Sequence, residues 1–346
     1  MAIKSKELAG LLGVSTATMS LVLNQKPGIS DELRNSLLQR VREMGYGYMI
    51  KDIEKEGPEA LNTDNIAYVI LSEYRDEVDE AAFFPPVLEG AEREARYQGY
   101  HFSIIHMYGE SIQNLRETVN PAQFAGMIVC TESLDGEMKR QLDRTEVPYI
   151  ALDCYDPLVE ISSVTVNNRQ GVCRAVEYLA SKGHRRIGYV SSGRSYTSLL
   201  ERRRAFRHAL EEAGLGCDGT NFVEVTGTGQ KAADCLRRLW SREKPPEALM
   251  VENDVLAASV YRALKDTGYE IPGDVSVVGF DGRSICSMLE PPLTTMRIPR
   301  RLLGRSLITL LKSKMDLRSR AVEDVTVRLE LNAELVEMGS VKERRG

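Results

Sequence analysis

From Asn65 onward, short apolar runs alternate with amphipathic segments, and this alternation restricts the fold more than any other feature of the chain. The runs are too short to be buried helices, whereas the segments between them have the apolar spacing of helices. Apolar strands separated by helices are typical of parallel sheets that are covered on both faces. We predict strands at 66–71, 101–107, 126–130, 149–152, 187–190, 248–251 and 275–280, and helices at 86–98, 199–213 and 254–266.

Residues 1–46 have a different pattern, which predicts three short helices. Ser5 is the expected cap of the first helix, and Gly13-Val14 is the expected break after it. Ser15 opens the second helix and Ser30 the third, which Gly45 ends. The first helix has an apolar set of Leu8, Leu11 and Leu12, the second buries Met19, Val22 and Leu23 and exposes Thr16, Ala17, Ser20 and Leu21, and the third has an inner stripe of Leu33, Leu37, Leu38 and Val41.

Two helices joined by a tight turn can place the second helix in the major groove of DNA. The charge distribution favours this function. The chain has a net charge of −5, whereas residues 1–51 contain seven Lys or Arg and four Asp or Glu. A basic head on an acidic body is expected when only the head meets phosphate. The alternative is a small helical bundle with no function of its own.

Other kinds of chemistry find little support in the sequence. No phosphate-binding glycine loop or nucleophile elbow follows a strand, so we expect no enzyme activity and no cofactor. The six cysteines contain no CxxC pair, and His101 and His106 lack metal-ligand spacing, so we expect reduced thiols and no metal. The chain has no apolar run of membrane length and no signal peptide, so we expect a cytoplasmic protein.

Several motifs, in order, carry a resemblance to a known family. Residues 7–24, which contain Gly13-Val14-Ser15-Thr16-Ala17-Thr18-Met19-Ser20, are followed by Pro27-Gly28-Ile29-Ser30 and Gly45-Tyr46. The later motifs are Lys182-Gly183-His184-Arg185-Arg186-Ile187-Gly188, Arg202-Arg203-Arg204-Ala205-Phe206, Asn253-Asp254, residues 271–281 and residues 290–295. The chain resembles the lactose-repressor/galactose-repressor (LacI/GalR) family along almost its whole length, except for the linker.

In the head, the resemblance implies a helix-turn-helix DNA-binding domain at 1–46. Thr16 and Ala17 lie where the family reads bases, and Ser15, Thr18 and Asn24 lie where it touches phosphate or fixes the helix. Leu21 stands where the family usually has Arg, so it either contacts a thymine methyl group or packs.

The linker, at 47–64, departs from the family pattern. Lys55 takes the position of the leucine that the family wedges into the minor groove, and the segment is acidic. We expect any minor-groove contact to be absent or rebuilt from Ile50 or Ile53. A flexible acidic tether is the alternative.

In the body, the resemblance implies a periplasmic-binding-protein-like type I core at 65–340, made of two doubly wound parallel-sheet subdomains. We expect the N-subdomain at about 65–163 plus 293–325 and the C-subdomain at about 164–292 plus 326–340. A ligand is expected in the cleft between them. Arg202 lies where the family clamps the ligand, Asn253, Asp281 and Asp153 where it bonds hydroxyl groups, and Phe84 where an aromatic ring stacks.

Together these features predict a ligand-responsive DNA-binding regulator that acts as a homodimer on a palindromic operator. The resemblance to the family implies that it is a repressor. The expected effector is a sugar or sugar phosphate, with a nucleobase as the less favoured choice. No C-terminal leucine heptad is present, which favours a dimer over a tetramer. Two alternatives stay open: a cytoplasmic solute-binding or sensor protein with a weakened DNA-binding head, and a Rossmann-like enzyme with an accessory helical domain.

Overall fold

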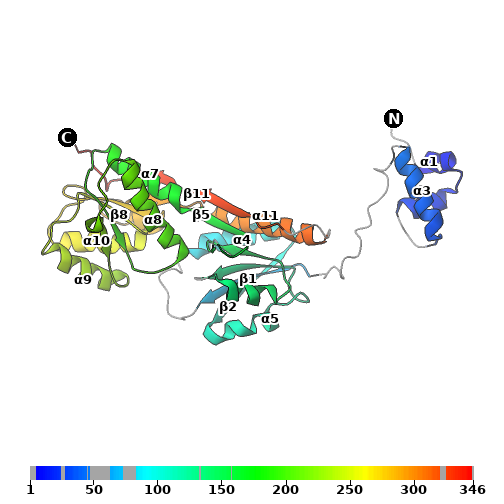
Figure 1. The fold of residues 1–346 in the computed structure, drawn as a ribbon, viewed down its shortest axis with the longest axis horizontal. Coiled ribbons are helices and arrows are strands. Elements are labelled where there is room, and N and C mark those ends of the chain that lie inside the picture. Colours follow the sequence, from blue (N-terminus) through cyan, green and yellow to red (C-terminus); the bar gives the residue numbers. More distant parts are fainter. Residues whose placement is uncertain are drawn as a thin grey trace. The chain divides into compact units, whose positions relative to one another are not determined.

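The computed structural model describes residues 5–24, 28–44, 46, 63–72, 83–131, 134–156, 158–319 and 325–344. The chain divides into two compact units. One comprises residues 1–60 with 316–323, and the other comprises 61–315 with 324–346. Each unit is described by itself (Figure 1).

The head contains three helices, α1 (Ser5–Leu12), α2 (Thr16–Leu23) and α3 (Asp31–Glu43). Gly13 has a φ of 70°, which reverses the chain between α1 and α2 at no steric cost for glycine. Ser15 caps α2, since its Oγ accepts a hydrogen bond from the Thr18 backbone N–H at 3.0 Å. The expected buried sets of α2 and of most of α3 are confirmed in a small core, which consists of Leu8, Ala9, Leu12, Met19, Val22, Leu23, Leu37, Leu38 and Val41.

Two apolar residues of the head differ from the expected pattern. Leu33 is 43% exposed, so its place in the inner stripe of α3 was wrong, and Leu11 is 58% exposed. At 3.6 residues per turn, each lies about 90–100° around its helix from the centre of the buried face, beyond the reach of the neighbouring helices. Helix α1 begins at Ser5, so this residue is its first helical residue and not its cap. Gly45, Ile50, Ile53 and Lys55 lie outside the described residues.

The first sheet has six strands in the order β11-β5-β4-β3-β1-β2, and every neighbouring pair is parallel. Its strands are β1 (Asn65–Ser72), β2 (His101–Tyr108), β3 (Gly126–Thr131), β4 (Tyr149–Leu152), β5 (Ser163–Asn167) and β11 (Arg328–Asn332). Alternate residues of β1 face opposite cores, Ile66 and Tyr68 on one side and Ala67 and Val69 on the other.

The second sheet has the order β12-β10-β9-β8-β6-β7, and only the pair of β10 with β12 is antiparallel. Its strands are β6 (Ile187–Ser191), β7 (Phe222–Glu224), β8 (Ala248–Val251), β9 (Ser276–Asp281), β10 (Thr294–Arg297) and β12 (Glu334–Val336). The predicted class of two doubly wound, mostly parallel sheets behind a helical head is therefore confirmed.

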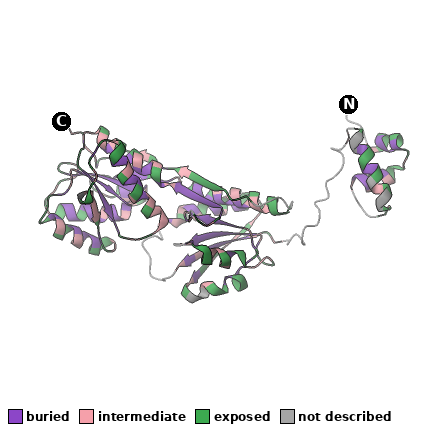
Figure 2. Ribbon diagram, in the orientation of Figure 1, coloured by how far each residue is buried: buried purple, intermediate pink, exposed green. Residues whose placement is uncertain are grey.

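Helices cover both faces of each sheet, and Figure 2 shows buried strands beneath helices with exposed outer faces. One core runs continuously under helices of both sheets, and two further cores fill the opposite faces. The helices are α4 (Phe84–Tyr97), α5 (Leu115–Thr118), α6 (Gly136–Asp143), α7 (Asn168–Ser181), α8 (Thr197–Glu212), α9 (Gly229–Trp240), α10 (Asp254–Asp266) and α11 (Arg300–Ser319).

The chain passes between the sheets at positions that differ from the expected subdomain limits. Strand β5 still belongs to the first sheet, although the C-subdomain was expected from residue 164. Strand β10 belongs to the second sheet and β11 to the first, so 293–297 and 328–332 were assigned to the wrong sides. The reason is that each chain segment completes a paired strand in one sheet before it crosses to the other.

Among the described residues, no single helix is long and apolar enough to span a membrane. One pair of helices, α1 and α2, passes that test together but is bent by 107°.

Candidate functional site

One pocket lies between the two sheets, where strands of both of them end. Its first wall comes from the start of α4 and the ends of β3 and β4, and its second wall from the loop before α8, from α8 itself and from the ends of β8 and β9. The space amounts to about 910 Å³, including the part open to solvent, which suits a small molecule. The lining includes Phe83, Phe84, Thr131, Asp153, Ser192, Arg194, Tyr196, Thr197, Arg202, Thr228, Asn253, Asp281 and Arg283.

Arg202 lies in the floor of this pocket and is only 4% exposed. Its Nη1 donates to the Glu252 carbonyl oxygen at 2.6 Å and to Asp281 Oδ1 at 3.2 Å, and its Nε donates to Asn168 Oδ1 at 2.9 Å. Its guanidinium carbon lies 3.9 Å from the centre of the Phe280 ring. These contacts fix the guanidinium in one orientation, which suits the recognition of a ligand's oxygen atoms.

Asp281 is held between two arginines at the end of β9. Besides Arg202, Arg283 contacts it, with Nε donating to Asp281 Oδ2 at 3.2 Å. Asp281 has a φ of 107°, a backbone conformation that few non-glycine residues adopt and that clusters at functional sites. The carboxylate is thereby presented in the pocket with its charge already compensated.

A second buried carboxylate, Asp254, supports the Asp281 turn from behind. Asp254 accepts hydrogen bonds from the Arg283 backbone N–H and the Thr295 hydroxyl, both at 2.7 Å. Burial, and then the nearby charge of Asp281, raise the pKa of Asp254. Gly279 makes this arrangement possible, because a Cβ there would come within 2.3 Å of Asp254 Oδ1.

Asp153 projects from the opposite wall of the pocket, directly after β4. It also has a positive φ, of 48°, and its Oδ1 accepts a hydrogen bond from the Val166 backbone N–H at 3.1 Å. Burial raises the pKa of Asp153 from 3.8 to about 6, although this bond and Arg202 act in the opposite direction.

Asn253 and Phe84 complete the predicted set. Asn253 caps α10, with its Oδ1 accepting from the Leu256 backbone N–H at 2.8 Å, so its amide group is held at the pocket wall. Phe84 packs edge-on against Phe83, with ring centres 5.5 Å apart. The structure therefore brings Arg202, Asn253, Asp281, Asp153 and Phe84 into one pocket.

Sequence reasoning missed several polar residues of the second wall, among them Arg194, Arg283, Tyr196 and Thr228. Arg194 and Tyr196 lie in the irregular loop before α8, and Thr228 is the N-cap position of α9. Loops have no periodic pattern that would mark such residues. The signal that was available is their position directly after strands, where ligands bind in folds of this kind.

In the head, α2 has an exposed face opposite to its buried face. Ser15, Thr16, Ala17 and Ser20 are exposed, whereas Leu21 is half-buried. The Ser15 hydroxyl also lies 2.8 Å from the Thr18 hydroxyl. Asn24 ends the helix, since its Nδ2 donates to the Ser20 carbonyl oxygen at 2.8 Å. Small hydroxyl and methyl groups on a rigid helix form a surface that can approach base edges closely.

Comparison with known proteins finds matches for both parts of the chain. Residues 5–47 match the family described as bacterial regulatory proteins, lacI family, and residues 176–341 match the periplasmic binding protein-like domain. Together the two matches cover more than half of the chain, in the order head then core. The chain thus has a LacI-family DNA-binding domain followed by a periplasmic-binding-protein-like domain. The resemblance deduced from its motifs is thereby confirmed.

Relatives extend the match to nearly the full length. The "HTH-type transcriptional repressor PurR" of Haemophilus influenzae is 26% identical over 340 residues, which are 97% of this chain and 98% of that protein. Among solved structures, a complex of the transcriptional regulator CelR with cellobiose has a TM-score of 0.71 at 24% identity and covers 98% of this chain and all of that one. The lac repressor dimer bound to operator and the anti-inducer ONPF has a TM-score of 0.69 at 21% identity, with 99% of this chain and all of that one covered.

These two domains, together with the repressor relatives, place the chain among DNA-binding transcriptional regulators that respond to ligands. The expectation that it is not an enzyme is confirmed, because the matched family and the full-length relatives are regulatory proteins. The Rossmann-like enzyme with an accessory helical domain is therefore set aside. Within the described residues, no cluster of His, Cys, Asp and Glu side chains has the geometry of a metal site.

Proposed function

We propose that this chain is a homodimeric transcriptional repressor of a palindromic operator. Its affinity for the operator is controlled by a sugar or sugar derivative that binds in the pocket between the two sheets. The observation that carries the proposal is the convergence of Arg202, Asn253, Asp281, Asp153 and Phe84 on that pocket. The protein acts in the cytoplasm, where bacterial DNA lies.

The difference between the two walls favours a polyhydroxylated ligand with one apolar face. The first wall presents Phe83 and Phe84 beside the carboxylate of Asp153, and an aromatic ring covers the apolar face of a sugar well. The second wall is rich in hydroxyl, amide and guanidinium groups. A carboxylate, an amide and a guanidinium together can hold neighbouring hydroxyl groups with specificity.

A nucleobase is the second candidate, and the name of the PurR relatives favours it. A flat aromatic base also stacks on a phenylalanine ring, and its carbonyl oxygens suit a guanidinium donor. A nucleobase offers few hydroxyl groups to Asp153 and Asp281, so we propose a sugar as the first candidate effector. A sugar phosphate would gain from the three arginines of the second wall, Arg194, Arg202 and Arg283.

On the DNA side, we propose that Thr16, Ala17 and Leu21 of α2 face base edges and that Ser15, Thr18 and Asn24 fix or flank the helix at the phosphates. One head contacts too few base pairs for high specificity, and a two-fold dimer on a palindrome doubles the contact. The effector acts by its preference for one arrangement of the two sheets over another, and the coupling cannot exceed that preference.

The test is calorimetric titration of the full-length protein with glucose, ribose, cellobiose, a hexose phosphate, adenine and guanine. We expect one of the sugars to bind and Arg202→Lys to weaken it by about 10- to 100-fold, the size of a charged hydrogen bond. Arg204→Ala, on the exposed face of the same helix, is the matched control. Binding of a nucleobase alone would move the effector to the second candidate, and binding that is insensitive to Arg202→Lys would refute the pocket assignment.

A further inference from the structure

A chain of polar contacts leads from the floor of the pocket to the boundary between the two sheets. Arg202 donates to Asn168 Oδ1, and Asn168 Nδ2 in turn donates to Glu201 Oε2 at 3.1 Å. Asn168 is almost completely buried and begins α7, directly after β5. The side chain that contacts the expected ligand clamp is therefore also bonded to the carboxylate of Glu201.

Glu201 contacts residues on the side of the first sheet, although it lies on α8, the helix that joins β6 to β7 of the second. The hydroxyl of Tyr155, which follows β4, donates to Glu201 Oε1. Arg328, the first residue of β11, has its Nη2 3.6 Å from the same oxygen. We call Tyr155, Asn168, Glu201 and Arg328 the Glu201 latch.

Two further contacts brace the latch. The guanidinium carbon of Arg328 lies 3.4 Å from the centre of the Tyr155 ring, so these two residues on the side of the first sheet support each other. The hydroxyl of Thr197, at the start of α8, donates to the Tyr155 carbonyl oxygen at 3.3 Å. The Glu201 side chain is 23% exposed, so its carboxylate is largely withdrawn from water and depends on these donors.

We infer that Glu201 is a positioning residue that holds the two sheets at the spacing seen here and that links this spacing to the orientation of Arg202. A rotation that opens the pocket separates Glu201 from Tyr155 and Arg328, because these residues belong to opposite sides. A ligand that fixes Arg202 also fixes Asn168, and thereby favours the arrangement in which Glu201 keeps its partners. This inference rests on the proposed function only where it concerns the effector.

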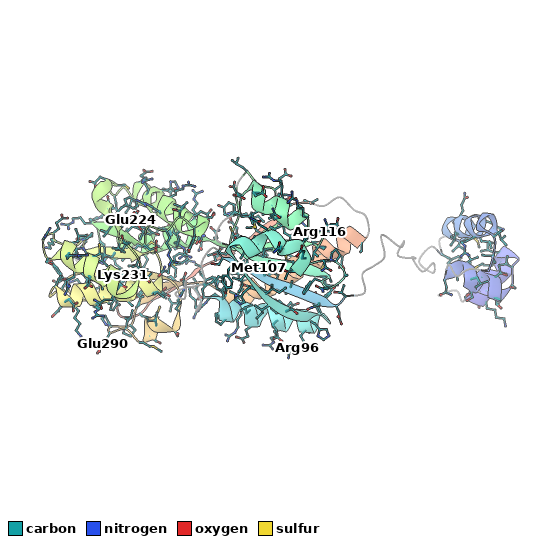
Figure 3. All side chains as sticks on the ribbon, turned by 90° about the horizontal axis from the view of Figure 1, so that it is seen from below. Arg96, Met107, Arg116, Glu224, Lys231 and Glu290 are labelled. Carbon is teal, nitrogen blue, oxygen red and sulfur yellow. The ribbon has the colours of Figure 1, made fainter. Side chains whose placement is uncertain are left out.

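The test measures the spacing of the two sides without any effector. Arg116 and Lys231 are exposed and lie on opposite sides, on α5 and α9 (Figure 3). Ketone-bearing amino acids at these two positions accept spin labels and leave the six cysteines unchanged. The distance between the two labels is then measured by pulsed electron paramagnetic resonance. Glu201→Gln keeps the size of the side chain but removes its charge. Glu211→Gln, on the exposed side of the same helix, is the control.

We expect Glu201→Gln to add a second distance population that the parent and Glu211→Gln lack. Tyr155→Phe, which removes a single hydroxyl group, should do the same to a smaller extent and covers the case in which Glu201→Gln does not fold. For the effector found by calorimetry, Glu201→Gln should lower the affinity about tenfold, while operator binding without effector persists. Distance distributions that are identical in all the folded variants would overturn the latch. A failure to bind any sugar would count against the proposed function alone, since the distances are measured without one.

Discussion

At the residue scale, Arg202 contributes to the fold as well as to the expected ligand site. It is the buried partner of Asp281 and also satisfies a backbone carbonyl and Asn168. Removing one member of a buried ion pair leaves the other charge uncompensated. We expect Arg202→Ala to lower the free energy of unfolding by about 3–5 kcal/mol in urea titrations, whereas Arg204→Ala changes it little. A loss as small as that of Arg204→Ala would contradict the buried pair.

The raised pKa of Asp153 predicts a pH-dependent stability. The folded protein holds the proton up to about pH 6, whereas the unfolded chain loses it near 3.8. The stabilising contribution of the protonated form is complete below about pH 4 and is lost as the pH rises through 6. Asp153→Asn avoids the cost of the buried charge and still accepts the bond from Val166.

We therefore expect Asp153→Asn to stabilise the core by about 3 kcal/mol at pH 7.5 and by only about 1 kcal/mol at pH 4.5. Thermal unfolding at the two pH values measures this difference. An equal stability change at both pH values would show that burial does not raise the pKa of Asp153 in the folded protein. The same variant should weaken effector binding, as the proposed function requires.

Some of the pocket residues could be predicted from the sequence and others could not, for physical reasons. Arg202, Asn253 and Asp281 belong to motifs that resemble the family, and they lie on helices or at strand ends, where the backbone fixes them. Arg194 and Arg283 lie in loops, whose course depends on tertiary contacts that no local pattern records. The double role of Asn253, as a helix cap and a pocket residue, became visible only in the structure.

At the scale of elements, the crossing of α4 and α11 depends on two glycines. A Cβ at Gly304 would lie 1.9 Å from the Val87 carbonyl oxygen, and one at Gly90 would lie 2.1 Å from the Arg301 carbonyl oxygen. The helix backbones are thus in direct contact, and the ion pairs Arg301–Glu89 and Arg305–Glu94 flank the crossing. No side chain fits at either position without moving a helix.

We expect Gly304→Ala to destabilise the core by at least about 2–3 kcal/mol, despite alanine's better helix propensity, because the added methyl group overpacks the crossing. Gly136→Ala, in the first turn of α6, meets only an Arg140 side chain at 3.7 Å and should be neutral or slightly stabilising. Chemical denaturation of both variants measures the contrast. A Gly304→Ala protein as stable as the parent would mean that the two helices are not in backbone contact.

Elements with clear apolar runs were predicted within about two residues at most ends, and helix 254–266 and strands 149–152 and 248–251 agree with the structure at both ends. Strand β5 was missed because Ser163 and Thr165 interrupt its apolar pattern, although both side chains are buried. Strand β11 was missed because its residues are mostly exposed at the edge of the sheet. In both cases pairing with neighbouring strands outweighs the local pattern.

At the scale of the whole molecule, the order of the strands explains the place of the pocket that we propose as the effector site. The chain forms five strands of the first sheet and then five strands of the second. It returns to the first sheet for β11 and ends in the second sheet with β12. The C-terminal ends of the parallel strands of both sheets border one pocket, so a single ligand can contact both sides. Under the proposed function, a change of spacing between the sheets would be the signal to the DNA-binding head.

Binding to DNA should depend strongly on salt, because the basic head supplies the phosphate contacts. For a dimer that neutralises about six to ten phosphates, the affinity for an operator should fall by about 10³–10⁵ between 50 and 200 mM salt. Fluorescence anisotropy with a labelled duplex measures this slope. An affinity independent of salt would contradict a phosphate-contacting head.

Sequence-specific DNA binding under effector control is tested most directly by selection from a random duplex library. The full-length protein is used at about 0.1 M salt, with and without the effector found by calorimetry. We predict an enriched palindrome whose half-sites are read by Thr16, Ala17 and Leu21, and whose enrichment changes when the effector is added. Absence of any enriched sequence under both conditions, from protein that is folded and dimeric, would contradict the regulator and favour a ligand-binding sensor with a weakened head.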